Sequence, residues 1–249
     1  MTAIKRVLLG AVLAWASAST WAAQTRVAVA ANFAAVMPQL AADFHARTGH
    51  EVQAVYGATG GLVAQITHGA PFDVLLAADT QRPQHLVDAG AAVADSLFVV
   101  ARGRLVLWSA RADVVDAQAQ VLRDGRFNKL ALADPKLAPY GAAALETLRA
   151  LGLEAATRPR WVMGASIGQA HQFVASGNAD LGFVAMSQVL ADGQLSSGSA
   201  WVVPAELHAP IDQAAVLLKR AATQEAARAW MAYLQSPPAK ALMRRYGYD

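Results

Sequence analysis

Apolar runs and helical patterns alternate along most of the chain. Residues 27–31 form an apolar run typical of a buried strand, and residues 33–47 then place apolar side chains at helical spacing. A strand at 51–56, a helix at 62–68 and a further apolar run at 72–78 follow in the same order. Because strand and helix alternate with short joints, the pattern predicts an α/β unit with a parallel sheet.

A second series of the same kind occupies the middle of the chain. Its predicted elements alternate between strand and helix and lie at 129–133, 140–151, 161–163, 167–175 and 180–185. Two helices are predicted near the C-terminus, at 223–234 and 238–246, with Thr223 and Ser236 as their N-caps.

Two further strands are predicted to connect the two series. The apolar stretch 97–108, interrupted by polar residues at 102–104, is expected to pass from one unit to the other, and residues 214–218 are expected to return. We therefore predict an α/β fold of two lobes with two crossing segments and a ligand cleft between the lobes. The expected boundaries are 23–103 plus 212–249 for lobe 1 and 104–211 for lobe 2.

The N-terminus has the pattern of a secretory signal peptide. Lys5 and Arg6 precede an apolar run at 7–15, which is followed by small residues at 16–23. The apolar run is shorter than the roughly 20 residues that a membrane span needs. We predict a signal peptide at 1–22, cleaved after Ala22, and hence a periplasmic protein.

Composition narrows the possible partners. The sequence has 21 basic and 18 acidic side chains, and removing Lys5 and Arg6 leaves 19 against 18, a net charge of about +1. This balance argues against a nucleic-acid partner. There are no cysteines, so the core must rely on the 55% of residues that are hydrophobic. The histidines show no metal-ligand spacing, and we expect a monomer with no metal ion and no cofactor.

Small polar residues lie at joints where a predicted strand ends and a predicted helix begins. Asn32, Thr59 and Ser166 occupy three such joints, and Tyr140 occupies a fourth. Each could simply be an N-cap, which typically contributes about 1 kcal/mol. Several joints at the carboxyl ends of parallel strands, however, form the usual ligand site of an open α/β sheet. Helix N-termini there favour an anion.

The joints contain no lysine or arginine, which restricts the kind of anion. A site made of N–H and O–H donors suits a compact oxyanion that is fully deprotonated and only accepts hydrogen bonds. Because each hydrogen bond to a charged group contributes roughly 1.5–3 kcal/mol, five or six could offset the dehydration of a small dianion.

Several short stretches, which follow one another in a fixed order along the chain, carry a resemblance to a known family. They lie at 29–33, 56–60, 69–74, 133–141, 177–184 and 244–248. Through them the sequence resembles the periplasmic molybdate-binding proteins of ABC importers from about residue 26 to 248. The resemblance implies a two-lobe, type II periplasmic-binding fold that closes on molybdate or tungstate. It also implies delivery to a membrane permease and no catalysis.

The same resemblance implies which residues hold the oxyanion. They are Ala31, Asn32, Thr59, Tyr140 and Ile167. Many members of the family have a tyrosine whose hydroxyl contacts the anion where this chain has Ala185. The hydroxyl of Tyr140 could take its place, so we expect Tyr140 and Asn32 to carry more of the side-chain donation.

Two other functions fit parts of the sequence. The same fold could bind another tetrahedral oxyanion such as sulfate, since cage size is not readable from sequence. Residues 164–168 also read G-x-S-x-G, which would make Ser166 the nucleophile of a serine hydrolase followed by Asp192 and His208. The chain lacks the glycine-rich oxyanion loop of such enzymes, so we expect a binding protein and not an enzyme.

Overall fold

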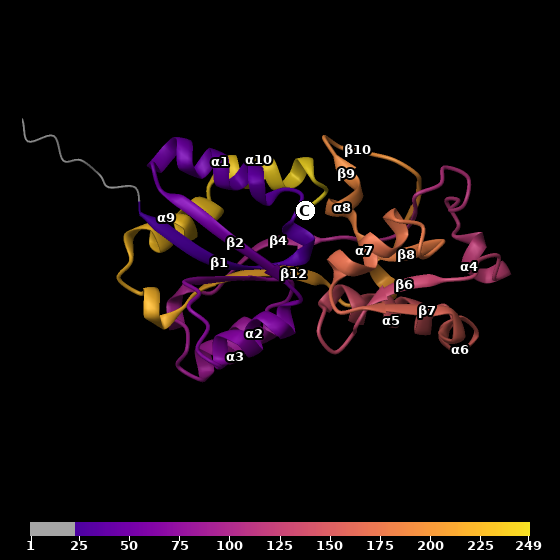
Figure 1. Cartoon of the computed structure of the whole chain (residues 1–249), viewed down its shortest axis with the longest axis horizontal. Coiled ribbons are helices and arrows are strands. Elements are labelled where there is room, and N and C mark those ends of the chain that lie inside the picture. Colours follow the sequence, from indigo (N-terminus) through magenta and orange to yellow (C-terminus); the bar gives the residue numbers. More distant parts are fainter. Residues whose placement is uncertain (1–22) are drawn as a thin grey trace, which may run out of the picture.

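A computed structural model describes residues 23–249, so the signal peptide predicted at 1–22 lies outside the described residues. The chain forms two five-stranded sheets that lie side by side, each flanked by helices (Figure 1). Within residues 23–249, no helix combines the length and apolar character needed to cross a bilayer.

The first sheet is built mainly from the N-terminal part of the chain. Its strands, in spatial order, are β2 (Glu51–Gly57), β1 (Gln24–Ala30), β3 (Val74–Ala77), β12 (Ile211–Leu217) and β4 (Phe98–Gly103). β1 pairs in parallel with β2 and β3, whereas β12 runs antiparallel to β3 and β4. The parallel sheet predicted for this half is therefore extended by β12, which runs opposite to β1, β2 and β3, and by β4, which runs in the same direction as those three.

Helices cover both faces of the first sheet (Figure 1). One face carries α1 (Met37–Thr48), α9 (Glu225–Leu234) and α10 (Pro237–Arg245), and the other carries α2 (Thr59–Thr67) and α3 (Gln81–Asp88). Alternate residues of β1 divide between these layers. Val27 and Val29 join the core that contains Phe44 of α1, and Ala28 joins the core that contains Leu62 of α2.

The second sheet contains the middle of the chain. Its strands, in spatial order, are β11 (Ser199–Val202), β5 (Leu105–Ser109), β8 (Leu181–Ala185), β6 (Leu130–Ala133) and β7 (Trp161–Gly164). Its helices are α4 (Gln120–Asp124), α5 (Pro139–Ala150), α6 (Glu154–Thr157), α7 (Ile167–Ala175) and α8 (Met186–Val189), followed by a hairpin of β9 (Leu190–Ala191) and β10 (Gln194–Leu195).

The chain crosses between the sheets at two places. β4 of the first sheet ends at Gly103 and β5 of the second begins at Leu105, so the stretch predicted at 97–108 is two strands separated by Arg104. The second crossing leads from β11 to β12. The lobe boundaries given above remain a prediction.

Several predicted helix ends differ from the structure. The helix expected from residue 33 is a 3-10 turn (Ala31–Phe33), and α1 begins only at Met37, because Pro38 is tolerated in the first turn of a helix but not in its interior. Ser236 caps α10 as predicted, accepting from the Ala239 N–H at 3.4 Å. Thr223 does not cap α9, because the extended residue before that helix is Gln224.

Candidate functional site

A small cavity of about 10 Å³ lies between the two sheets. The first sheet contributes the carboxyl ends of β1 and β2 and the residue after β3, where ligands bind in open α/β folds. The second contributes the starts of α5 and α7. All five residues expected to hold the ligand line this cavity: Ala31, Asn32, Thr59, Tyr140 and Ile167.

Thr59 lines the cavity and has a hydroxyl proton available to donate. The residue is almost fully buried, and its Oγ1 accepts a hydrogen bond of 3.1 Å from the Ala78 N–H. A hydroxyl has one proton to donate, and none of residues 23–249 accepts it. Thr59 is the first residue of α2, while Ala58 occupies the N-cap position, so the hydroxyl does not serve as a cap.

Asn32 directs its side-chain amide to polar groups beside the cavity. Its Nδ2 donates to Gln213 Oε1 and to the Tyr248 hydroxyl, both at 2.8 Å. Gln213 Nε2 donates to the Ile211 carbonyl at 2.7 Å, so Gln213 must present its oxygen to Asn32. Both amide protons of Asn32 are thereby used, and its Oδ1 has no partner within the described chain. The donor that Asn32 retains for a ligand is its backbone N–H.

Tyr140 offers a neutral, buried phenol. Its hydroxyl has no hydrogen-bond partner among residues 23–249 and lies against Gly103, where an added Cβ would fall 2.0 Å from the oxygen. Burial raises the pKa of Tyr140 well above its usual value, and the nearby Tyr248 adds to this rise. The phenol therefore remains a protonated donor.

Three helix starts supply further donors. The backbone N–H groups of Thr59, Tyr140 and Ile167 have no partner among the described residues, as expected in the first turn of a helix. Each helix start also carries a partial positive charge. Ser166 caps α7 by accepting from the Gln169 N–H at 3.3 Å, which fixes the start at Ile167.

A contact that the sequence analysis missed links the two sides of the cavity. Arg82 at the start of α3 forms an ion pair of 2.6 Å with Asp79 and donates to the Lys136 carbonyl at 2.8 Å. Beside it, the Gly60 N–H donates to the Leu137 carbonyl at 2.9 Å. The spacing of Asp79 and Arg82 suggests a local ion pair, but nothing in the sequence indicates the partner across the cavity.

The hydrolase alternative is not supported by the positions of its three residues. Ser166 caps a helix, Asp192 accepts from Arg245 Nε at 2.8 Å, and the His208 ring lies 2.7 Å from the Ala209 carbonyl. No hydrogen bond joins the three side chains within residues 23–249. A nucleophile would need a base within hydrogen-bond reach.

The cavity is suited to holding an anion without reacting with it. No lysine or arginine is among the described residues that line it, and those residues carry backbone N–H groups and the hydroxyls of Thr59 and Tyr140. Such donors accept no proton at neutral pH and recognise the shape of a hydrogen-bond acceptor. The arrangement therefore supports binding of a hydrogen-bond acceptor.

Comparisons with known proteins agree that the chain is a binding protein. A family model described as "Bacterial extracellular solute-binding protein" matches residues 25–249. The molybdate-binding protein ModA of Azotobacter vinelandii is 51% identical over 97% of this chain and 95% of its own length. The protein of the same name from Rhodobacter capsulatus is 46% identical over 91% and 88%. The solved periplasmic molybdate-binding protein of A. vinelandii matches with a TM-score of 0.87 and 40% identity, covering 90% of this chain and 98% of that one.

Proposed function

Because the chain belongs to the family of bacterial extracellular solute-binding proteins, we propose that it captures molybdate in the periplasm and delivers it to an ABC permease. The observation that carries this proposal is a small cavity lined by uncharged donors at three helix starts. Tungstate, an oxyanion of the same charge and shape, is the second proposed ligand. Catalysis has no part in the proposed function, in line with the binding proteins that the chain resembles.

The proposed ligand residues come from both proposed lobes. Thr59 and the backbone of Asn32 belong to 23–103, while Tyr140 and Ile167 belong to 104–211. The full set of donors therefore exists only when the lobes are closed. Binding shifts the population toward the closed form because the ligand interacts more strongly with that form.

A calorimetric titration with molybdate, tungstate, sulfate, phosphate and chromate tests the proposal. We expect one site that binds molybdate and tungstate at least roughly 100-fold more tightly than sulfate, a difference of about 2.7 kcal/mol. Equal affinity for sulfate would contradict the proposed specificity. Absence of binding to every oxyanion in the panel would contradict the proposed function as a whole.

Tyr140→Phe is expected to change affinity and stability in opposite directions. Loss of the hydroxyl removes a donor, so we expect the Kd for molybdate to rise about tenfold. In the ligand-free protein the same change removes a buried hydroxyl without a partner, so the melting temperature should stay level or rise. Calorimetry and a thermal melt measure the two effects.

The matched control is Tyr56→Phe, since the Tyr56 side chain is 44% exposed. It should change neither the affinity nor the melting temperature. If Tyr140→Phe left the affinity unchanged as well, Tyr140 would contribute only its backbone N–H.

A further inference from the structure

The last three residues of the chain contact three separate parts of the molecule. Gly247 lies so close to α8 that an added Cβ would fall 2.8 Å from Met186 Sδ, and its φ of +79° also favours glycine. Tyr248 contacts Asn32 beside the cavity. Asp249 pairs with the backbone of Arg102, with N–O distances of 2.8 and 3.0 Å. Arg102 immediately precedes the first crossing between the sheets.

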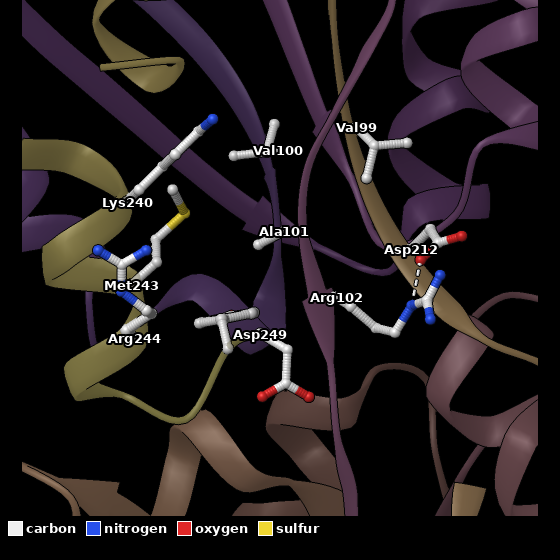
Figure 2. A pocket seen from close by; sticks show the side chains of 10 residues that line it. Val99, Val100, Ala101, Arg102, Asp212, Lys240, Met243, Arg244 and Asp249 are labelled. Atoms are coloured by element: carbon white, nitrogen blue, oxygen red, sulfur yellow. Dashed lines mark hydrogen bonds and ion pairs between the residues drawn. The ribbon is translucent and has the colours of Figure 1, made fainter. Parts of the chain in front are cut away.

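Figure 2 shows a pocket that lies beside these C-terminal residues. Asp249 lies beside the strand that carries Ala101 and Arg102, and α10 passes on the opposite side of a pocket of about 460 Å³. Met243 of α10 also lines the pocket. Tyr248 also lines this pocket, and it bonds to Asn32 of the candidate anion site, so it connects the two.

Tyr248 holds both the side chain and the backbone of Asn32. Its hydroxyl accepts from Asn32 Nδ2 at 2.8 Å and donates to the Asn32 carbonyl at 3.1 Å. Ser187 of α8 donates to the same carbonyl at 2.8 Å. The ring of Tyr248 stacks on Phe33, with centroids 4.9 Å apart and planes at 13°. Asn32 and its neighbour are therefore fixed by a residue 216 positions away in the sequence.

These contacts bear on a ligand although Tyr248 does not line the cavity. Asn32 is fully buried and has both amide protons engaged, so its backbone N–H is the donor left for an anion. A backbone donor contributes fully only when its direction is set before the ligand arrives. The bonds to the Asn32 side-chain amide and carbonyl hold the residue in place and thereby restrain the position of its backbone N–H.

We propose that Tyr248 is a positioning residue for the anion site, acting through Asn32. The inference rests on the proposed function, namely that this cavity binds an oxyanion. Burial raises the pKa of the Tyr248 phenol, so the hydroxyl stays neutral and keeps both of its bonds at physiological pH. Loss of the hydroxyl leaves the donor of Asn32 present but less firmly directed.

The test is calorimetric titration of molybdate into the Tyr248→Phe protein. Phenylalanine keeps the stacking on Phe33 and removes only the hydroxyl, so the Kd is expected to rise about tenfold, mainly through faster dissociation. The matched control is Tyr246→Phe, whose hydroxyl accepts from Gln39 Nε2 at 2.7 Å on the surface. The control should stay within about twofold of the unmodified protein.

A double-mutant cycle distinguishes positioning from a general loss of stability. If Tyr248 acts through Asn32, adding Tyr248→Phe to Asn32→Ala should weaken binding less than Tyr248→Phe does alone, because only the bond to the Asn32 carbonyl is then left to lose. Two fully additive losses would overturn the inference. So would an unchanged Kd in Tyr248→Phe. If the unmodified protein bound no oxyanion, the proposed function itself would fail, and the inference with it.

Ser187→Ala tests the same point at the other bond to the Asn32 carbonyl. It removes that donor and keeps the Tyr248 hydroxyl, and it serves if Tyr248→Phe does not fold. We expect the Kd for molybdate to rise about threefold. An affinity equal to that of the unmodified protein would contradict the inference that the bonds to the Asn32 carbonyl restrain the backbone N–H of Asn32.

Discussion

Replacing Thr59 with valine is expected to raise the Kd for molybdate by about 100-fold, the largest loss among the proposed ligand residues. The substitution removes the hydroxyl proton that is available to donate. It also deprives the Ala78 N–H of its acceptor and leaves that buried donor unpaired. A hydrogen bond to a charged group contributes roughly 1.5–3 kcal/mol, and an unsatisfied buried donor costs about 1–3 kcal/mol. Calorimetric titration measures the change in affinity.

Thr59→Ser is the matched control for this prediction. Serine keeps the hydroxyl and loses only a methyl group, so it should bind within a few-fold of the unmodified protein. The melting temperature of each ligand-free variant separates loss of binding from loss of structure. A valine variant that bound molybdate within about threefold of the unmodified protein would show that the Thr59 hydroxyl is not a ligand donor.

Gly141→Ala is expected to cause the largest loss of stability among the substitutions considered. A Cβ at Gly141 would lie 2.3 Å from the Ala133 carbonyl oxygen and 3.0 Å from the Asp134 carbonyl carbon. These are backbone atoms of β6 and its following loop, so they cannot turn aside as a side chain could. We expect unfolding to become easier by about 3 kcal/mol or more, which lowers the melting temperature by roughly 6–12 °C.

The effect of Gly141→Ala should extend to ligand binding, because the first turn of α5 must move. Tyr140 precedes Gly141, lines the cavity and is one of the proposed ligand residues. The control is Gly61→Ala in α2, where an added Cβ meets nothing within 4 Å. That change should leave stability level or raise it by about 0.4–1 kcal/mol. Equal melting temperatures for the two variants would contradict the steric argument.

The candidate site was predictable from sequence where its signals are local. A buried strand ending in a small polar residue and then a helix is visible within ten residues, and this pattern identified the joints at Thr59 and Ser166. Thr59 lines the cavity, and so does Ile167, the residue after Ser166 that the family resemblance implied. Two successive series of alternating strands and helices along the chain also predicted two α/β units. Local pattern and backbone geometry agree here because the donors are the helix starts themselves.

Side-chain direction was not predictable in the same way. We expected the Asn32 side chain to serve the anion, yet it bonds to Gln213 and Tyr248, which are 181 and 216 residues away. Distant partners of this kind leave no periodic trace in the sequence. The position of Pro38 did contain a usable signal, since a proline six residues into a predicted helix argues for a later start.

The pairing of Asn32 with Tyr248 also sets an order of events during synthesis. The ribosome makes β1 and Thr59 early, whereas the hydroxyl that fixes Asn32 is on the second-to-last residue. The backbone of Asp249 then closes against Arg102. Asn32 therefore gains these bonds only after Tyr248 has been synthesised and has packed against it. The residue that is made early in the site thus depends for its final restraints on one that is made more than 200 positions later.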